Sequence, residues 1–151
     1  MNEVDRKILT LLQKDGSISM AQLSERIGLS ISACHRRVKM LEAAGVIQNY
    51  SACLDRKALG LELHVFIEAK LVSERREDMV AFESAIRNTP EILECYMISG
   101  EFTYLLRVAA KNAGHYEKLY REQLSILPSM SQMKTLLTLG TVKEFQGYHL
   151  G

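Results

Sequence analysis

Two similar segments follow one another after residue 61, and this repeat limits the possible folds more than any other feature of the chain. Each segment contains a β-rich run, an amphipathic stretch with apolar residues at helical spacing, and a second strand-like run. The strand-like runs span residues 63–71, 92–98, 104–109 and 133–139. Both prolines of the chain, Pro90 and Pro128, stand where the helix of each segment should end, because proline blocks helix continuation. The repeat therefore predicts two βαβ units in tandem.

Two βαβ units in tandem give the order β-α-β-β-α-β of a ferredoxin-like domain. Right-handed crossovers place both helices on one face of such a sheet. The residues expected to point inward from these helices are Met79, Phe82, Ile86, Tyr116, Leu119, Tyr120 and Leu127. The opposite face stays open, with Phe66, Tyr96 and Ile98 as its apolar members. Sheets with such a face commonly cover it by dimerising, so self-association is expected.

The first 45 residues predict three short helices. Apolar residues at helical spacing place the first helix at 3–14, and Gly16 stands where a helix can stop in the left-handed conformation. Ser19 and Gln22 form a capping-box pattern that starts the second helix. The third helix is expected to begin at Ser30 and to end at Gly45.

A tight turn at Gly28-Leu29-Ser30 joins the second and third helices, and this is the pattern of a helix-turn-helix. After the third helix, residues 46–53 have a strand-like pattern and residues 54–61 are a connector.

The predicted third helix has one apolar and one polar face at 100° per residue. Cys34, Val38 and Leu41 cluster on one side, whereas small and cationic residues cluster on the other. A helix that packs on its domain and enters the major groove needs this division. The candidate DNA-binding residues are Arg26, Ser30, Ser32, Ala33, His35, Arg36, Arg37 and Lys39. An isolated basic helix is at least as often merely a solvated face, but the capped helix and the glycine turn before it favour DNA binding.

Within this set the residue types suggest different contacts. Arg36 has the planar fork that suits a guanine edge, and Lys39 and Arg26 suit phosphates. Ser32, near the helix N-terminus, suits a phosphate or a base edge. Arg37 lies beside the apolar stripe, so it is expected to tie the helix to its own domain or to a nearby phosphate.

Composition supports a globular protein that works inside the cell. With 47% hydrophobic and 25% charged residues, the chain is not of the disordered class. No apolar stretch reaches the ~20 residues of a membrane span, and the start of the chain lacks the pattern of a signal peptide. Three cysteines without C-x-x-C spacing are expected to be reduced thiols, which predicts a cytoplasmic location and no partner membrane.

The net charge of +1 hides an asymmetry along the chain. Up to Lys57 there are nine basic and six acidic residues, an excess of +3 that leaves −2 for the remainder. This excess alone is weak evidence for nucleic-acid binding.

No pattern of an enzyme or of a metal site is present. The four histidines, His35, His64, His115 and His149, are scattered, and none belongs to an H-E-x-x-H motif. Cys95 stands in mid-strand, where a small core residue is expected more often than a nucleophile. The sequence therefore predicts no catalytic residue, no metal and no cofactor.

The chain resembles the Lrp/AsnC family of feast/famine regulators over nearly its full length. The matching N-terminal stretches are Asp5-Arg6-Lys7-Ile8-Leu9, Leu11-Leu12-Gln13-Lys14-Asp15-Gly16, Leu23 through Ser30, Arg36-Arg37-Val38-Lys39, Leu41-Glu42 and Gly45-Val46-Ile47 with Tyr50. The matching C-terminal stretches are Pro90-Glu91, Glu94-Cys95-Tyr96, Ser99-Gly100, Tyr104-Leu105-Leu106 and Val142-Lys143.

This resemblance implies an α+β protein with a three-helix helix-turn-helix domain at 1–50, a linker at 51–61 and a ferredoxin-like βαββαβ domain at 62–151. The first domain would bind double-stranded DNA. The second would pair subunits into dimers, commonly gathered into octamers, and bind an amino-acid effector between subunits. In the family this effector lies near the turn between the second and third strands.

Carried onto this sequence, the effector site comprises a turn and part of the last strand. Its expected residues are Gly100, Glu101, Thr103, Tyr104, Thr135, Leu136 and Thr138. Gly100 lets the backbone come close to a ligand, and the last strand would add an apolar floor with hydroxyl edges.

The sequence departs from the family pattern in two places. Ile31 and Ala33 replace the usual prolines of the third helix, which bears on base preference. Thr103 stands where the family usually has an acid, and a hydroxyl cannot supply the charge that an effector's ammonium group needs. Glu101 is either a substitute for that acid or a solvated turn residue.

Two functions of different classes remain open at this point. The first is a transcription factor gated by an amino acid or another small effector. The second is an architectural DNA-binding protein whose C-terminal domain only drives assembly, and Thr103 keeps this alternative open.

Overall fold

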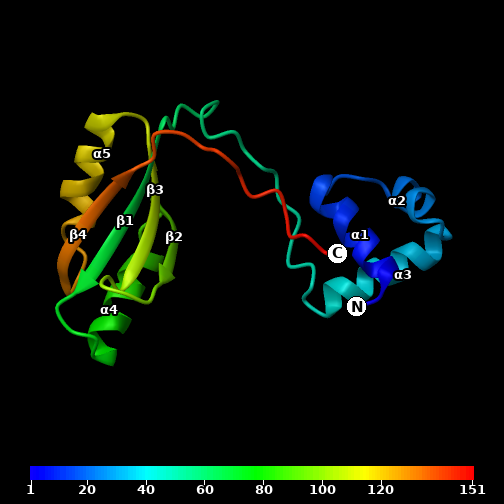
Figure 1. Ribbon diagram of the computed structural model, residues 1–151, viewed down its shortest axis with the longest axis horizontal. Coiled ribbons are helices and arrows are strands. Elements are labelled where there is room, and N and C mark those ends of the chain that lie inside the picture. The colour runs from blue at the N-terminus through cyan, green and yellow to red at the C-terminus, as the bar shows by residue number, and fades with distance from the viewer. The chain divides into compact units, whose positions relative to one another are not determined.

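The computed structural model describes residues 1–151 and divides them into two units (Figure 1). The N-terminal unit comprises Met1–Cys53 together with Val142–Gly151, and the sheet unit comprises Leu54–Thr141. Residues 142–151, which the sequence analysis assigns to the C-terminal domain, thus pack with the N-terminal helices.

Three helices form the N-terminal unit: α1 (Glu3–Lys14), α2 (Met20–Ile27) and α3 (Ile31–Ala43). Their starts are fixed by polar side chains that accept hydrogen bonds from the first backbone N–H groups. Capping boxes start α1 (Asn2 with Asp5) and α2 (Ser19 with Gln22), and Ser30 caps α3. The buried core that joins the helices consists of Ile8, Leu9, Ile18, Leu23, Cys34, Val38 and Leu41.

The ends of these helices confirm one glycine prediction and correct another. Gly28 ends α2 at φ 72°, in the left-handed region where glycine meets no steric penalty. Gly16 is not left-handed, because α1 ends at Asp15 in an extended conformation. The expected strand at 46–53 is also wrong, because these residues form no ladder. A single extended segment without a neighbouring strand has no hydrogen-bond partners for its backbone.

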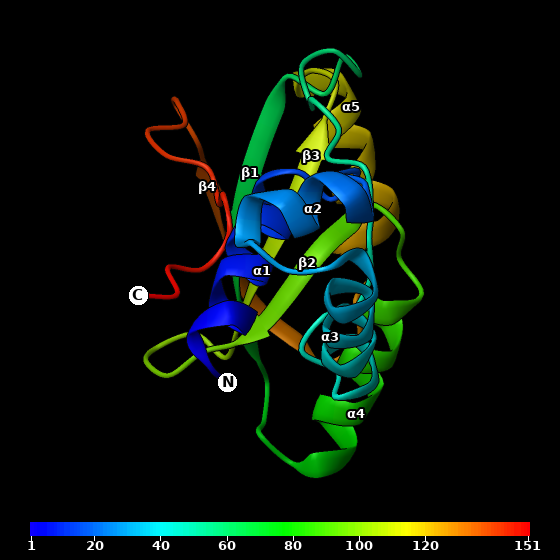
Figure 2. The same cartoon turned by 90° about the vertical axis from the view of Figure 1, so that its right-hand side faces the viewer.

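Four antiparallel strands in the order β2-β3-β1-β4 form the sheet. The elements of this unit are β1 (Leu63–Leu71), α4 (Arg76–Arg87), β2 (Ile92–Met97), β3 (Tyr104–Ala110), α5 (Ala113–Leu119), a π-helical turn η1 (Tyr120–Leu124) and β4 (Met130–Leu137). This order and connectivity confirm the predicted ferredoxin-like domain and the α+β class. Figure 2 shows both helices on the same side of the sheet.

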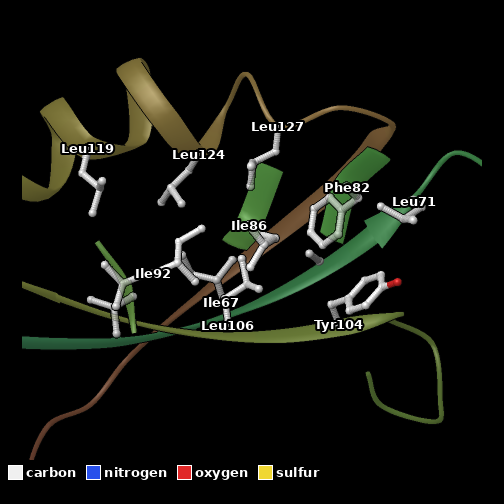
Figure 3. Close-up of a cluster of buried hydrophobic side chains, with 13 residues drawn as sticks. Ile67, Leu71, Phe82, Ile86, Ile92, Tyr104, Leu106, Leu119, Leu124 and Leu127 are labelled. Atoms are coloured by element: carbon white, nitrogen blue, oxygen red, sulfur yellow. The ribbon is translucent and has the colours of Figure 1, made fainter. Parts of the chain in front are cut away.

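The core of the sheet unit lies between this face of the sheet and its two helices (Figure 3). Alternate β1 residues Val65, Ile67 and Ala69 are fully buried there. Phe82 of α4 packs on Tyr104 of β3, with ring centroids 4.7 Å apart. The Tyr104 hydroxyl donates a hydrogen bond of 2.9 Å to Glu83, so the one polar group of this ring pair is satisfied.

One predicted inward residue of the second helix is wrong. Tyr120 is exposed, whereas Leu119 and Leu124 are buried. The helix widens after Leu119 into the π turn, in which the Ser125 N–H donates to the Tyr120 carbonyl. A π turn contains an extra residue, so it shifts which side chains face the sheet beyond that point.

Neither helix of the sheet unit lies on the opposite face of the sheet. Phe66 on β1 and Tyr96 on β2 belong to it, as predicted, and Tyr96 is 53% exposed. Charged residues interrupt its apolar surface at Glu68, Glu94 and Arg107. We call this surface the open face. None of the helices is long and apolar enough to span a membrane.

The fold predicts that substitutions at two positions on α4 differ sharply in the stability that they cost. Phe82→Ala should destabilise the sheet unit by about 3–5 kcal/mol, because it removes a fully buried ring and leaves a cavity against Tyr104. Val80→Ala, at an exposed position of the same helix, should change stability by no more than about 0.5 kcal/mol. Urea denaturation at equal protein concentrations measures both, and equal effects would contradict the assigned core.

Candidate functional site

Helix α3 presents a polar and cationic surface on the side away from the core. Ser32, Arg36 and Lys39 are exposed, whereas Cys34 and Val38 are buried. Arg36 forms no ion pair and no side-chain hydrogen bond within the protein. A cationic fork that is exposed and unpaired is available to an external acceptor.

Arg37 has a different role from its neighbour. Its Nη1 lies 2.9 Å from Oδ1 of Asp5 on α1, and both side chains are partly buried. Asp5 also closes the capping box of α1. Arg37 therefore ties α3 to α1, which is one of the two roles expected from its place beside the apolar stripe.

Lys39 is held by an acid that the sequence analysis did not single out. Its Nζ lies 2.7 Å from Oε2 of Glu42, and the Tyr50 hydroxyl donates to the other oxygen at 3.2 Å. The hydrogen bond from Lys39 is the main cause that lowers the pKa of Glu42, so this carboxylate stays charged. The i, i+3 spacing is the signal that was available in the sequence. A phosphate must compete with Glu42 for Lys39.

The start of α3 combines a cap with exposed polar groups. Ser30 Oγ accepts the Ala33 N–H at 3.3 Å and lies 3.3 Å from Ser32 Oγ. Ser30 thus fixes the helix N-terminus, while Ser32 and His35 stand on its exposed surface. Arg26 of α2 is exposed as well.

The turn between β2 and β3 contains several of the expected effector residues. Gly100 adopts φ +128°, a conformation that other residues rarely adopt, and Glu101 beside it is exposed. Thr103 is buried, its N–H donates to the Ala69 carbonyl at 2.9 Å, and its own carbonyl accepts the Ile98 N–H at 3.0 Å. One backbone hydrogen bond therefore fixes the turn to β1, and the other closes the turn itself.

The other expected effector residues do not converge on this turn within one protomer. Tyr104 lies in the core under Phe82, and the Thr135 hydroxyl lies 2.9 Å from that of Tyr116. Leu136 is paired with Phe66 and lies on the open face, because neighbouring strand residues point to opposite sides. The Thr138 hydroxyl donates to the His64 carbonyl at 2.7 Å.

Three residues that the sequence analysis did not select gather at the turn instead. Nζ of Lys134 on β4 lies 5.9 Å from the centre of the buried Phe102 ring and 3.4 Å from Oε2 of Glu68 on β1. This oxygen is buried and accepts no hydrogen bond. An aromatic ring, a cation and a carboxylate thus adjoin one another; we call these residues the Glu68 cluster. The register of β1 with β4 places Glu68 opposite Lys134, and that register is not readable from the sequence. Phe102 joins them from the turn between β2 and β3.

No group of three or more His, Cys, Asp or Glu side chains could hold a metal ion. Burial is the main cause that raises the pKa of Cys95 to about 11, so its thiol is uncharged and unreactive at neutral pH.

Comparison with known proteins also finds two domains in the chain. Residues 1–48 match the family model of winged helix-turn-helix DNA-binding domains, and residues 64–148 match that of the Lrp/AsnC ligand-binding domain. The chain belongs to the Lrp/AsnC family. It is thus a DNA-binding transcriptional regulator with an effector-binding domain, a class of protein that is not enzymatic.

Individual members of the Lrp/AsnC family match almost the whole chain. The proline dehydrogenase transcriptional activator of Rhizobium radiobacter is 38% identical over 95% of this chain and 92% of its own. The leucine-responsive regulatory protein of Escherichia coli K12 is 39% identical over 95% of this chain and 88% of its own. A transcriptional regulator of Neisseria meningitidis, solved in complex with L-methionine, superposes with a TM-score of 0.94 at 29% identity, covering 99% of this chain and 97% of its own.

Proposed function

We propose that this Lrp/AsnC regulator reads specific DNA sites with the outward surface of α3 and is controlled by an amino acid that binds at the turn between β2 and β3. The unpaired, exposed guanidinium of Arg36 on a capped helix is the observation that carries the DNA-reading part. The proposal places the protein in the cytoplasm, where the DNA is.

Each outward residue of α3 has a role that its chemistry suits. Ser32 and Ala33 are small, so the start of the helix can approach the base edges closely. Arg36 reads a guanine edge, and Lys39, released from Glu42, contacts a phosphate together with Arg26 and the nearby His35. Arg37 contributes indirectly by fixing the angle of α3 on α1.

Separate substitutions should distinguish base reading from phosphate contact. Arg36→Ala should lower the affinity for a site selected from random DNA by about 1–3 kcal/mol and relax base preference. Lys39→Ala should weaken binding to all sequences and reduce the slope of log affinity against log salt by about one unit. Fluorescence anisotropy over a salt series measures both. If the double variant binds like the wild type, α3 does not read the groove.

The amino-acid part rests on the Glu68 cluster and on the relative solved with L-methionine. A free amino acid carries an ammonium group, a carboxylate and a side chain. In our proposal the ammonium group binds Glu68, which supplies the negative charge that Thr103 cannot supply. Lys134 turns from Glu68 to the ligand carboxylate, and Phe102 contacts an apolar side chain. The Thr103 hydroxyl and the backbone at Gly100 and Glu101 line the edge.

This assignment makes Glu68 the residue on which affinity depends. Calorimetry with the amino acid that gives the largest thermal shift among the twenty should show at least about a tenfold loss for Glu68→Gln. Glu94→Gln is the matched control, because Oε1 of Glu94 also lies 3.4 Å from a cation of the open face, Nη2 of Arg107. This variant should bind the amino acid with wild-type affinity. Thr103→Asp should bind more tightly.

Two outcomes would contradict the assignment. Equal affinity of Glu68→Gln and the wild type would remove Glu68 from the site. If none of the twenty amino acids binds the wild type, the architectural alternative is favoured.

Self-association is a further part of the proposal, with dimers formed through the open face and gathered into octamers. Apolar groups on this face are exposed, among them Tyr96 and Leu136. A second copy can cover this apolar surface. Two paired DNA-binding heads also gain affinity for a two-fold symmetric site.

A charge placed on the open face should weaken this assembly. Tyr96→Glu should shift the mass from light scattering towards smaller species at micromolar concentration, because a carboxylate would be buried against the partner. Val80→Glu, at 56% exposure on α4 and comparable to Tyr96 at 53%, should leave the mass unchanged. A wild type that is monomeric under the same conditions would rule out the proposal.

A further inference from the structure

The last ten residues of the chain belong to the N-terminal unit, although they follow the last strand of the sheet unit. Figure 1 shows the C-terminus beside α1. Along this segment Val142, Phe145 and Tyr148 are largely exposed. Burial of apolar side chains along its length therefore does not account for its placement.

A single glutamine side chain on α1 holds the segment through its backbone. Nε2 of Gln13 donates to the Tyr148 carbonyl at 3.1 Å, and Oε1 of Gln13 accepts the Tyr148 N–H at 2.6 Å. The amide thus satisfies both backbone groups of one residue, as a neighbouring strand would. This contact does not depend on the tyrosine side chain.

The residue before this contact is a glycine, in a conformation that other residues rarely adopt. Gly147 has φ +103°, which disfavours any other residue, and a Cβ on it would lie 2.6 Å from Oε1 and 2.8 Å from Cδ of Gln13. Beyond it, Leu150 packs against the core of the three helices. The segment is therefore attached at two neighbouring points, a backbone clamp at Gln13 and an apolar anchor at Leu150.

The other end of the segment is fixed to the sheet. Directly after β4, the N–H and the hydroxyl of Thr138 both donate to the His64 carbonyl, at 3.0 and 2.7 Å. The chain passes between the units twice, once after Cys53 and once after Thr141. The second passage begins at an anchored strand end and finishes at the clamp on α1.

We propose that residues 139–151 form a strap that links β4 of the effector-binding domain to α1 of the DNA-binding unit and restrains the motion of one relative to the other. The clamp at Gln13 is its releasable end, because two exposed hydrogen bonds and one partly buried leucine hold it. Release leaves both units folded, joined only by the connector at 54–61.

Hydrogen exchange on the full chain tests whether the clamp exists in solution. The Tyr148 amide should exchange slowly in the wild type and at least about tenfold faster in Gly147→Ala, whose methyl group displaces Gln13. Gln13→Ala should give the same result by removing the acceptor. Gly140→Ala is the matched control, because a Cβ there meets nothing within 4 Å, and it should exchange as the wild type. Equal exchange in all four proteins would overturn the clamp.

Pulsed electron resonance between spin labels tests the restraint itself. Labels at Glu25→Cys on α2 and Lys118→Cys on α5, with the exposed thiol removed by Cys53→Ser, report the distance between the units. Labelled chains are diluted with unlabelled ones so that only pairs within one subunit contribute. Gly147→Ala should broaden the distance distribution, and Gly140→Ala should not. Equal widths would show that the segment packs on α1 without restraining the units. Neither measurement depends on DNA or on an amino acid. A failure of the strap proposal is therefore distinct from a failure of the proposed function.

Discussion

The alternation of side chains along β1 determines what the sheet unit can do. Val65, Ile67 and Ala69 point into the core beneath α4 and α5, so Phe66 and Glu68 must point to the other side. Because the sheet unit has only two helices, α4 and α5, and both lie on the same side of the sheet, its open face remains for other uses. The surface we assign to dimerisation and the Glu68 cluster that we assign to the amino acid both follow from this one constraint.

The N-terminal unit must hold three short helices in place. Three helices of 12, 8 and 13 residues are too short to be stable alone, and their starts depend on side-chain caps at Asn2, Ser19 and Ser30. The buried stripe of α3 and the Arg37–Asp5 pair hold that helix in place. On its outer surface, Arg36 contacts no other side chain through an ion pair or hydrogen bond, whereas Lys39 is paired with Glu42. The proposed strap adds a contact on α1, at Gln13.

Features that depend on neighbours along the chain could be predicted from the sequence. The caps at Ser19 and Ser30, the bounds of α1 and β1, and the order of the two βαβ units are of this kind. The buried and exposed positions of α3 also agreed with its helical periodicity. Features that depend on distant contacts could not be predicted. The Glu68 cluster needs the register of β1 with β4, and the clamp joins Gln13 to Tyr148 across 135 positions. The π turn, which begins at Tyr120 and places Leu124 in the core, breaks the helical periodicity on which the prediction relied.

Photocrosslinking tests most directly whether the outward surface of α3 enters the DNA groove. A benzophenone amino acid at position 32 would lie on that surface, whereas one at Thr10 would lie on an exposed part of α1. The protein would be irradiated on DNA selected from a random pool, and the adducts mapped by primer extension. The account predicts adducts on bases, clustered within the recognition site, from position 32 and not from position 10. The absence of adducts from position 32, or adducts spread evenly along the DNA backbone, would contradict this placement of α3.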